Sequence, residues 1–183
     1  FDTAYYYHGE KSEAAFRAAV AKRWPRESYT ITDKLPIYEK PEERELLPIF
    51  NEQLHRCGVE HFDYYLLHNV GGKNYQHAEA VHAFEFLGQR KAEGRVKHIG
   101  LSYHDNAELL ETILNRHPEI EYVQLQLNYL DWEDCAVQSH RCYDVCKRYG
   151  KPVIVMEPIK GGSLAALPEE AEKLLKAHNP RAS

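Results

Sequence analysis

The segment YTITDKLPIYEKPEERELLPIFNEQLHRCGVEHFDYYLLHN (residues 29–69) contains a complete strand–helix–strand unit. Its two β-rich runs, 29–35 and 63–69, flank a stretch at 41–56 whose apolar residues recur with helical spacing. A strand, a crossing helix and a second strand in this order pair their strands in parallel. The segment therefore predicts an α/β fold in which helices pack against a parallel sheet.

The same alternation continues along the rest of the chain. Strand-like and helix-like stretches follow one another with short connections, and residues 1–4 have the composition of a strand end. Further strands are expected at 96–102, 122–128 and 152–158. Further helices are expected at 12–23, 78–94, 106–116, 135–150 and 167–178.

The spacing of the strand ends favours one particular α/β architecture. Strand ends that recur about every 30 residues suit a (β/α)8 TIM barrel better than an open Rossmann sheet. No Gly-x-Gly-x-x-Gly run follows any predicted strand, as a Rossmann dinucleotide site would require. The chain has 183 residues, fewer than the about 250 of a typical barrel. We therefore expect residues 1–183 to form one partial barrel domain, from the end of the second strand to the seventh helix, within a longer chain.

Composition and charge argue against several classes of protein. No apolar run approaches the roughly 20 residues that span a bilayer, so no membrane partner is expected. The net charge is −5 and no segment is dominated by Lys and Arg, which gives a nucleic-acid partner no electrostatic support. The few cysteines do not resemble a disulfide scaffold, so a reduced, cytoplasmic setting is expected. Cys142 and Cys146 share a predicted helix face, where we interpret them as packed side chains rather than metal ligands.

Four polar residues stand at the ends of successive strand-like runs: Asp2, Tyr7, Lys34 and His68. In a parallel barrel the carboxyl ends of the strands meet at one face, so these side chains can converge. Hydride addition to a carbonyl places charge on the oxygen, and an acid must then deliver a proton. An ammonium group beside a phenol makes the phenol a better proton donor, and a carboxylate can hold that ammonium. The set therefore predicts reduction of a carbonyl.

With their flanking residues, these four positions resemble the aldo-keto reductase family over nearly the whole chain. The resemblance lies in the step Asp2-Thr-Ala-x-x-Tyr7, in Lys34, and in Leu-Leu-His68. It implies an oxidoreductase that reduces a small aldehyde or ketone with NADPH. Tyr7 would then be the general acid, Lys34 and Asp2 its charged partners, and His68 the residue that orients the carbonyl. Tyr5 and Tyr6 adjoin Tyr7 in the same run and remain alternatives to it.

The resemblance also implies a set of cofactor contacts. These positions are Ser102, Gln124, Met156, Pro158, Gly161 and Gly162. Tyr103 stands where the family has an asparagine that contacts the nicotinamide amide. Met156 stands where many relatives stack an aromatic ring. Gln126 and Asn128 share the strand face of Gln124 and are further candidates. The segment 158–163 resembles the loop that lies along the cofactor's pyrophosphate, where glycines allow close backbone approach.

The choice between NADPH and NADH rests on the resemblance, which favours NADPH. The phrases QLQLNYLDWED (124–134) and VIVMEPIKGGSLA (153–165) resemble a bacterial branch whose C-terminal extension carries an iron–sulfur segment. No Cys-x-x-Cys-x-x-Cys run occurs in the chain. A 4Fe-4S cluster is therefore expected only if such an extension exists.

Two other functions are consistent with parts of the sequence. The first is a regulatory module that binds the cofactor without turnover, as in potassium-channel β subunits. The second is a barrel metallohydrolase that uses Asp2, His68 and His104 at strand ends, although no His-x-His motif is present. Lys34 would crowd a cation at that site. We therefore expect no metal ligands and prefer the reductase.

Overall fold

Five parallel strands form the centre of the computed structural model, which describes residues 1–179. Each strand pairs with its successor in the chain. The strands are β1 (Thr32–Leu35), β2 (Phe62–Val70), β3 (Val96–Tyr103), β4 (Tyr122–Gln126) and β5 (Val153–Met156). Ahead of β1, Asp2 forms an isolated parallel bridge with Thr32. The prediction of a parallel α/β fold is confirmed, and this strand order is that of a partial (β/α) barrel.

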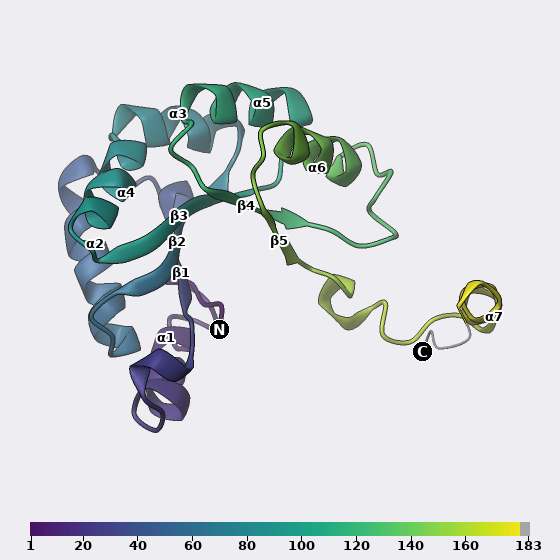
Figure 1. Cartoon of the computed structure of the whole chain (residues 1–183), viewed down its shortest axis with the longest axis horizontal. Coiled ribbons are helices and arrows are strands. Elements are labelled where there is room, and N and C mark those ends of the chain that lie inside the picture. Colours follow the sequence, from purple (N-terminus) through teal and green to yellow (C-terminus); the bar gives the residue numbers. More distant parts are fainter. Residues whose placement is uncertain (180–183) are drawn as a thin grey trace.

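Helices connect the strands. They are α1 (Ser12–Phe16), α2 (Glu43–Cys57), α3 (Gly72–Ala80), α4 (Ala83–Ala92), α5 (Ala107–Arg116), α6 (Ser139–Arg148) and α7 (Glu169–His178). Helices α2 to α6 lie along one side of the curved sheet, whereas α7 lies away from it beyond β5 (Figure 1). Within residues 1–179, no helix is both long and apolar enough to cross a membrane.

The two faces of the sheet have different roles. Leu35, Leu67, Leu101 and Val123 are register partners on neighbouring strands and belong to the hydrophobic core shared with the helices. Because strand side chains alternate between faces, Lys34 and its register partners lie on the opposite face. That face also carries Ser102 and Gln124. The strands thus present an apolar face to the helices and a polar face at the interior of the curve.

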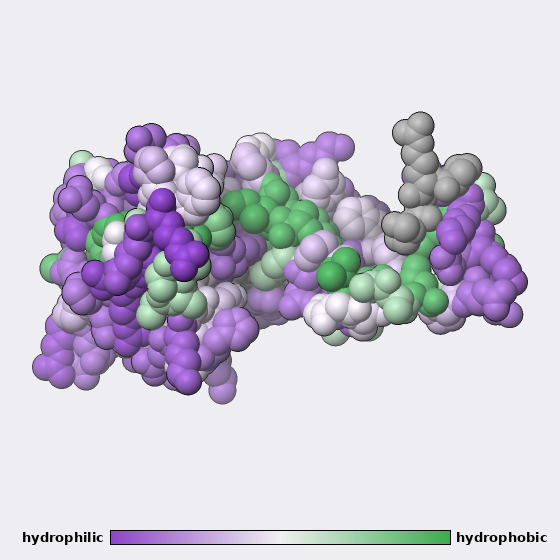
Figure 2. Space-filling model, turned by 90° about the horizontal axis from the view of Figure 1, so that it is seen from below, coloured by the Kyte–Doolittle hydropathy of each residue, from purple (hydrophilic) through white to green (hydrophobic). Residues whose placement is uncertain are grey.

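Strand β5 is less well covered than the strands before it. None of its four residues is buried, and Val155 is 48% exposed. Ile159, in the loop that follows, is also exposed. Seen from below, the surface carries a hydrophobic area near its middle, between more hydrophilic regions (Figure 2). Apolar surface therefore remains accessible at this end of the sheet.

Two predicted helices are divided or shortened in the structure at a residue with a left-handed backbone. The helix expected at 78–94 is two helices, α3 and α4, because His82 adopts a left-handed backbone (φ 54°) between them. The helix expected at 135–150 begins only at Ser139, after Gln138 adopts a similar conformation (φ 50°). The Ser139 hydroxyl donates to the Gln126 carbonyl oxygen at 2.7 Å, which ties the helix start to the end of β4. Helical periodicity alone does not locate such breaks.

Candidate active site

Lys34 is the most constrained charged residue on the polar face of the sheet. Its side chain leaves β1 almost completely buried, at 1% exposure. The ammonium donates to Asp2 Oδ2 at 2.6 Å and to the Thr3 carbonyl oxygen at 2.8 Å. A buried charge is tolerated when a counter-charge and hydrogen bonds surround it. The bridge between Asp2 and Thr32 places the Asp2 carboxylate within hydrogen-bonding distance of the Lys34 ammonium.

Tyr7 lies against both Lys34 and His68. The Lys34 ammonium is 4.7 Å from the centre of the Tyr7 ring. The rings of Tyr7 and His68 are 5.6 Å apart and nearly perpendicular, at 80°. A turn after Ala4, in which the Tyr7 amide donates to the Ala4 carbonyl oxygen at 3.1 Å, brings the phenol over the strand ends. The structure therefore brings the four predicted residues together, while their catalytic roles stay predictions.

Tyr5 and Tyr6, the alternatives to Tyr7, have other contacts. The Tyr5 hydroxyl donates to Glu52 on α2 at 2.6 Å, and the Arg56 guanidinium lies 4.2 Å from its ring centre. Burial, together with the bond to Glu52, raises the pKa of Tyr5. The Tyr6 ring packs against Tyr5 at 4.8 Å. Neither arrangement places a phenol between an ammonium and an imidazole, so the geometry favours Tyr7.

His68 is held as a neutral imidazole. Burial is the largest cause, followed by the charges of Lys34 and His104, and together they lower the pKa of His68 to about 3. Its Nδ1 is buried without a hydrogen-bond partner in the described part of the chain. The ring of Tyr38, from the turn after β1, lies 5.1 Å away. A neutral imidazole can donate one hydrogen bond to a carbonyl oxygen without releasing a proton.

Ser102 and Gln124 are register partners on β3 and β4, and both are buried. The Ser102 Oγ accepts a hydrogen bond from the Asn69 amide at 2.8 Å, which leaves its hydroxyl hydrogen free to donate. Gln124 Oε1 is buried and has no partner among residues 1–179. A donor beside an unsatisfied acceptor matches a primary carboxamide, which needs one of each. These two residues therefore fit the amide of a nicotinamide.

Tyr103 does not belong to this arrangement. Its ring is buried at 2% exposure and belongs to the hydrophobic core, and its hydroxyl donates to the Asn106 carbonyl oxygen at 2.6 Å. His104 follows it at the end of β3. The charge of His104 contributes to the lowered pKa of His68, and burial lowers the pKa of His104 itself. In the sequence, His104 was a candidate only for a metal ligand, and its place beside His68 was not predicted.

The remaining predicted cofactor positions follow one another at the carboxyl end of β5. Met156 is the last residue of the strand and pairs with Gln126 of β4. Pro158 is exposed in the loop, and Gly161 (φ 62°) and Gly162 (φ 98°) adopt left-handed conformations there. Left-handed backbone is favourable for glycine because it has no Cβ. Their contacts with a cofactor stay predictions.

Gln126 and Asn128, the further candidates for amide binding, already have partners. Gln126 Nε2 and Asn128 Nδ2 both donate to Asp131 Oδ2, at 2.7 and 2.8 Å. Asp131 also pairs with Lys160. Asp131 was not predicted as part of the site, and Lys160 was included only within the loop at 158–163. The only signal was the spacing of Asn128 and Asp131, which suits a turn closed by the asparagine side chain.

The metallohydrolase arrangement has no support in the described residues. Among them, Asp2, His68 and His104 do not bring their ligand atoms within 4.8 Å of one another. The group that meets this distance is Glu13, Asp33 and Cys57, all buried. Asp33 follows the alternation of β1 and lies opposite Lys34, so this group is behind the strand. Asp2 is instead bound to the Lys34 ammonium.

Comparisons with known proteins identify the family and the fold of the chain. The family model described as "Aldo/keto reductase family" matches residues 1–182. No curated protein matches the chain in sequence. Solved structures with the same fold include an aldo/keto reductase from Brucella melitensis, with 20% identity over 99% of this chain and a TM-score of 0.71.

Two further solved structures are similar. The thermostable aldo-keto reductase Tm1743, in complex with the inhibitor epalrestat, has 23% identity over 100% of this chain and a TM-score of 0.74. An aldo-keto reductase from Klebsiella pneumoniae in complex with NADPH has 18% identity over 97% of this chain and a TM-score of 0.68. The chain spans 64%, 63% and 60% of the length of the three structures. At these identities the likeness shows the fold.

Proposed function

The chain belongs to the aldo/keto reductase family, and we propose that its site reduces an aldehyde or ketone to an alcohol with NADPH. One observation carries the proposal. The Lys34 ammonium, held by Asp2, lies against the ring of Tyr7, which in turn contacts His68. An acid, a cation beside it and a neutral hydrogen-bond donor are the groups that carbonyl reduction requires of a protein.

Each of the four residues has one role in the proposed reaction. When bound, the reduced nicotinamide supplies a hydride to the carbonyl carbon. The Tyr7 hydroxyl gives its proton to the carbonyl oxygen, so the C=O bond becomes the C–OH of the alcohol. The Lys34 ammonium stabilises the charge left on the Tyr7 oxygen until solvent returns a proton, and Asp2 keeps that ammonium in place. His68 donates a hydrogen bond that orients the carbonyl.

The proposed cofactor contacts use the other strand ends. The Ser102 hydroxyl donates to the carboxamide oxygen of the nicotinamide, and Gln124 Oε1 accepts from its NH2 group. The unsatisfied Gln124 oxygen supports this assignment. Met156 packs its thioether against the ring, and Pro158, Gly161 and Gly162 lie along the phosphates. A 4Fe-4S cluster forms no part of the proposal.

Two measurements on the purified protein test this function. Titration with NADPH, followed by the fluorescence of the reduced nicotinamide, reports binding. Oxidation of NADPH in the presence of a generic aldehyde then reports turnover. We expect both. Binding without turnover of a broad aldehyde and ketone panel would favour the regulatory module, and no binding of either NADPH or NADH would overturn the proposal.

A further inference from the structure

The loop after β5, residues 157–162, has an unusual backbone. Glu157 (φ 56°) and Lys160 (φ 48°) adopt left-handed conformations, as do Gly161 and Gly162. This region is unfavourable for residues that carry a Cβ, so it persists where surrounding contacts impose it. Two such residues within four positions indicate that the loop is held in its shape from outside.

The contacts that hold the loop come from the segment after β4. Asn128 Nδ2 donates to the carbonyl oxygen of Glu157, the first left-handed residue, at 3.2 Å. Lys160 is the second left-handed residue, and its ammonium forms a hydrogen-bonded ion pair with Asp131. The Leu127 amide donates to the Met156 carbonyl oxygen at 3.1 Å, which aligns the two segments.

Asp131 is the centre of these contacts. It is 3% exposed, and its Oδ2 accepts from both Gln126 and Asn128. Its backbone amide donates to Asn128 Oδ1 at 2.9 Å, so the asparagine is fixed at both ends of its amide. The hydrogen bond to Lys160 lowers the pKa of Asp131 most, followed by the bonds to Asn128 and Gln126, and together they bring this pKa to about 2. Asp131 is thus a buried anion whose partners define the geometry of two loops.

We propose that Asp131 is a positioning residue for a nucleotide diphosphate: through Lys160 and Asn128 it sets the 157–162 loop in the shape that receives the phosphates. This inference rests on the proposed function, which places that loop along the cofactor. The Lys160 side chain remains 39% exposed while bound to Asp131. It therefore presents positive charge beside Gly161 and Gly162, whose backbone can approach a phosphate closely.

The test separates the diphosphate from the rest of the cofactor. Asp131→Asn keeps the size of the side chain but removes its charge. We expect the Kd and KM for NADPH to rise about tenfold, the effect of losing one charge-assisted hydrogen bond, while kcat stays within about twofold. Turnover with reduced nicotinamide riboside, which has no phosphate, should be unchanged. Asp131→Glu, which restores the carboxylate, should recover part of the lost affinity.

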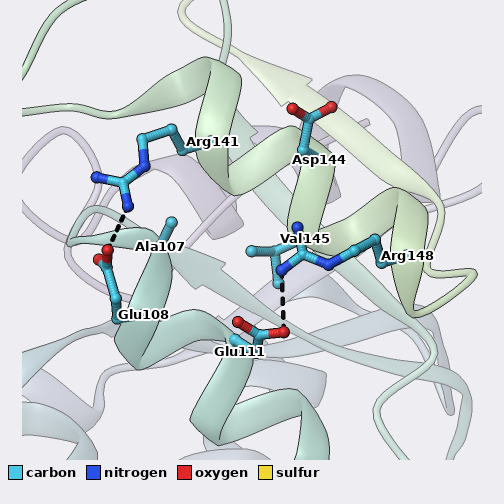
Figure 3. Close-up of a pocket in the computed structure, with 7 residues that line it drawn as sticks. All are labelled: Ala107, Glu108, Glu111, Arg141, Asp144, Val145 and Arg148. Carbon is cyan, nitrogen blue, oxygen red and sulfur yellow. Dashed lines mark hydrogen bonds and ion pairs between the residues drawn. The ribbon is translucent and has the colours of Figure 1, made fainter.

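Lys160→Met is a second test at a partly exposed position, so its result does not depend on whether an Asp131 variant folds. It should weaken NADPH binding at least as much, because it removes both the contact with Asp131 and the positive charge beside the phosphates. The double variant should be weakened by less than the sum of the two single effects, because the two residues share one contact. The matched control is Glu111→Gln, which breaks the ion pair with Arg148 at 2.9 Å between α5 and α6 (Figure 3). Neither helix carries a residue of the proposed site.

The outcomes distinguish this inference from the function on which it rests. Unchanged or tighter NADPH binding in Asp131→Asn and Lys160→Met would overturn the positioning role and leave the reductase intact. An equal loss with the riboside would also overturn it, because the effect would then not concern the phosphates. Wild-type protein that binds no NADPH would overturn the proposed function and this role with it.

Discussion

Asp33 and Lys34 are neighbours on β1, and their side chains lie on opposite faces of the sheet. Lys34 faces Asp2 and Tyr7, whereas Asp33 is buried beside Glu13, Gln53 and Cys57. The two residues remain linked, because the Lys34 amide donates to Asp33 Oδ1 at 2.8 Å. The polar group behind the strand therefore supports the backbone that presents the lysine.

The buried pair of Glu13 and Asp33 predicts a stability that falls as pH rises. Burial and the charge of Glu13 raise the pKa of Asp33, and burial raises the pKa of Glu13. A folded pKa above the unfolded value means that the folded state retains a proton which the unfolded chain has released. The stabilisation from this pair is therefore fully present below the pKa of the unfolded chain, and it is lost as the pH rises through the pKa of the folded state. For each proton retained, the free energy of unfolding falls by up to about 1.4 kcal/mol per pH unit.

Glu13→Gln should flatten this dependence, because an amide cannot ionise and can donate to Asp33. Urea unfolding at a series of pH values, starting near the unfolded carboxyl pKa of about 4 and rising to alkaline pH, measures the effect. The control is Glu10→Gln, since Glu10 also pairs with Arg56, at 3.1 Å, but is about half exposed. An equal change of unfolding free energy with pH in wild type and Glu13→Gln would contradict the retention of a proton by this pair.

Tyr7→Phe should abolish carbonyl reduction and leave NADPH affinity nearly intact, because the hydroxyl acts on the substrate oxygen. Removal of a general acid lowers the rate by roughly 10² to 10⁴-fold. Tyr6→Phe is the matched control, since that neighbouring ring packs against Tyr5 and should tolerate the loss of its hydroxyl. Steady-state turnover and fluorescence titration give the two numbers, and full activity in Tyr7→Phe would assign the acid to another residue.

The alternation of the sequence was sufficient to predict where the polar residues of the site lie. Lys34 and His68 close apolar runs, and parallel pairing of those runs brings their ends together without further information. Ser102 and Gln124 were predicted instead from the family resemblance, and the structure makes them register partners on β3 and β4. Local pattern therefore predicted the fold class and the convergence at the strand ends.

Contacts between distant segments could not be predicted in this way. Asn128 and Gln126 have the right alternation for a cofactor contact, yet both bind Asp131, whose ion pair with Lys160, 29 residues away in the chain, is not revealed by sequence spacing. The burial of Glu13 beside Asp33 likewise depends on how α1 packs behind β1. Such placements are set by tertiary packing, which overrides the preference of each residue for water.

His68 predicts a second pH effect, of opposite sign. Its pKa, lowered to about 3, lies below the value of about 6.5 for an unfolded chain. Between these values the unfolded chain binds a proton that the folded state excludes, so stability is complete above about pH 6.5 and falls toward pH 3.

His68→Gln should reduce this loss in urea unfolding at pH 7 and pH 5, relative to His178→Gln, which changes an exposed histidine on α7. Equal slopes in all three proteins would show that His68 titrates normally. Because His68 stays neutral, turnover between pH 5 and 8 should not follow its protonation.

A substitution at Gly100 tests how closely the sheet is packed on the face that carries the site. It lies on β3 beside Tyr122, and a Cβ at this position would be 2.6 Å from Tyr122 Cζ, closer than real contacts allow. Tyr122 is itself 3% exposed, so its ring has little room to move. Gly100→Ala should therefore destabilise the fold by about 1–3 kcal/mol. It should also lower kcat/KM, because Gly100 and Tyr122 are in register with Lys34 on the sheet face that carries the site, so a displaced ring would disturb that face. Gly88→Ala, in α4 with nothing within 4 Å, should instead stabilise the protein by up to about 1 kcal/mol, as alanine favours helix. Urea unfolding of both variants gives the comparison, and a Gly100→Ala protein as stable as wild type would mean that the ring yields without strain.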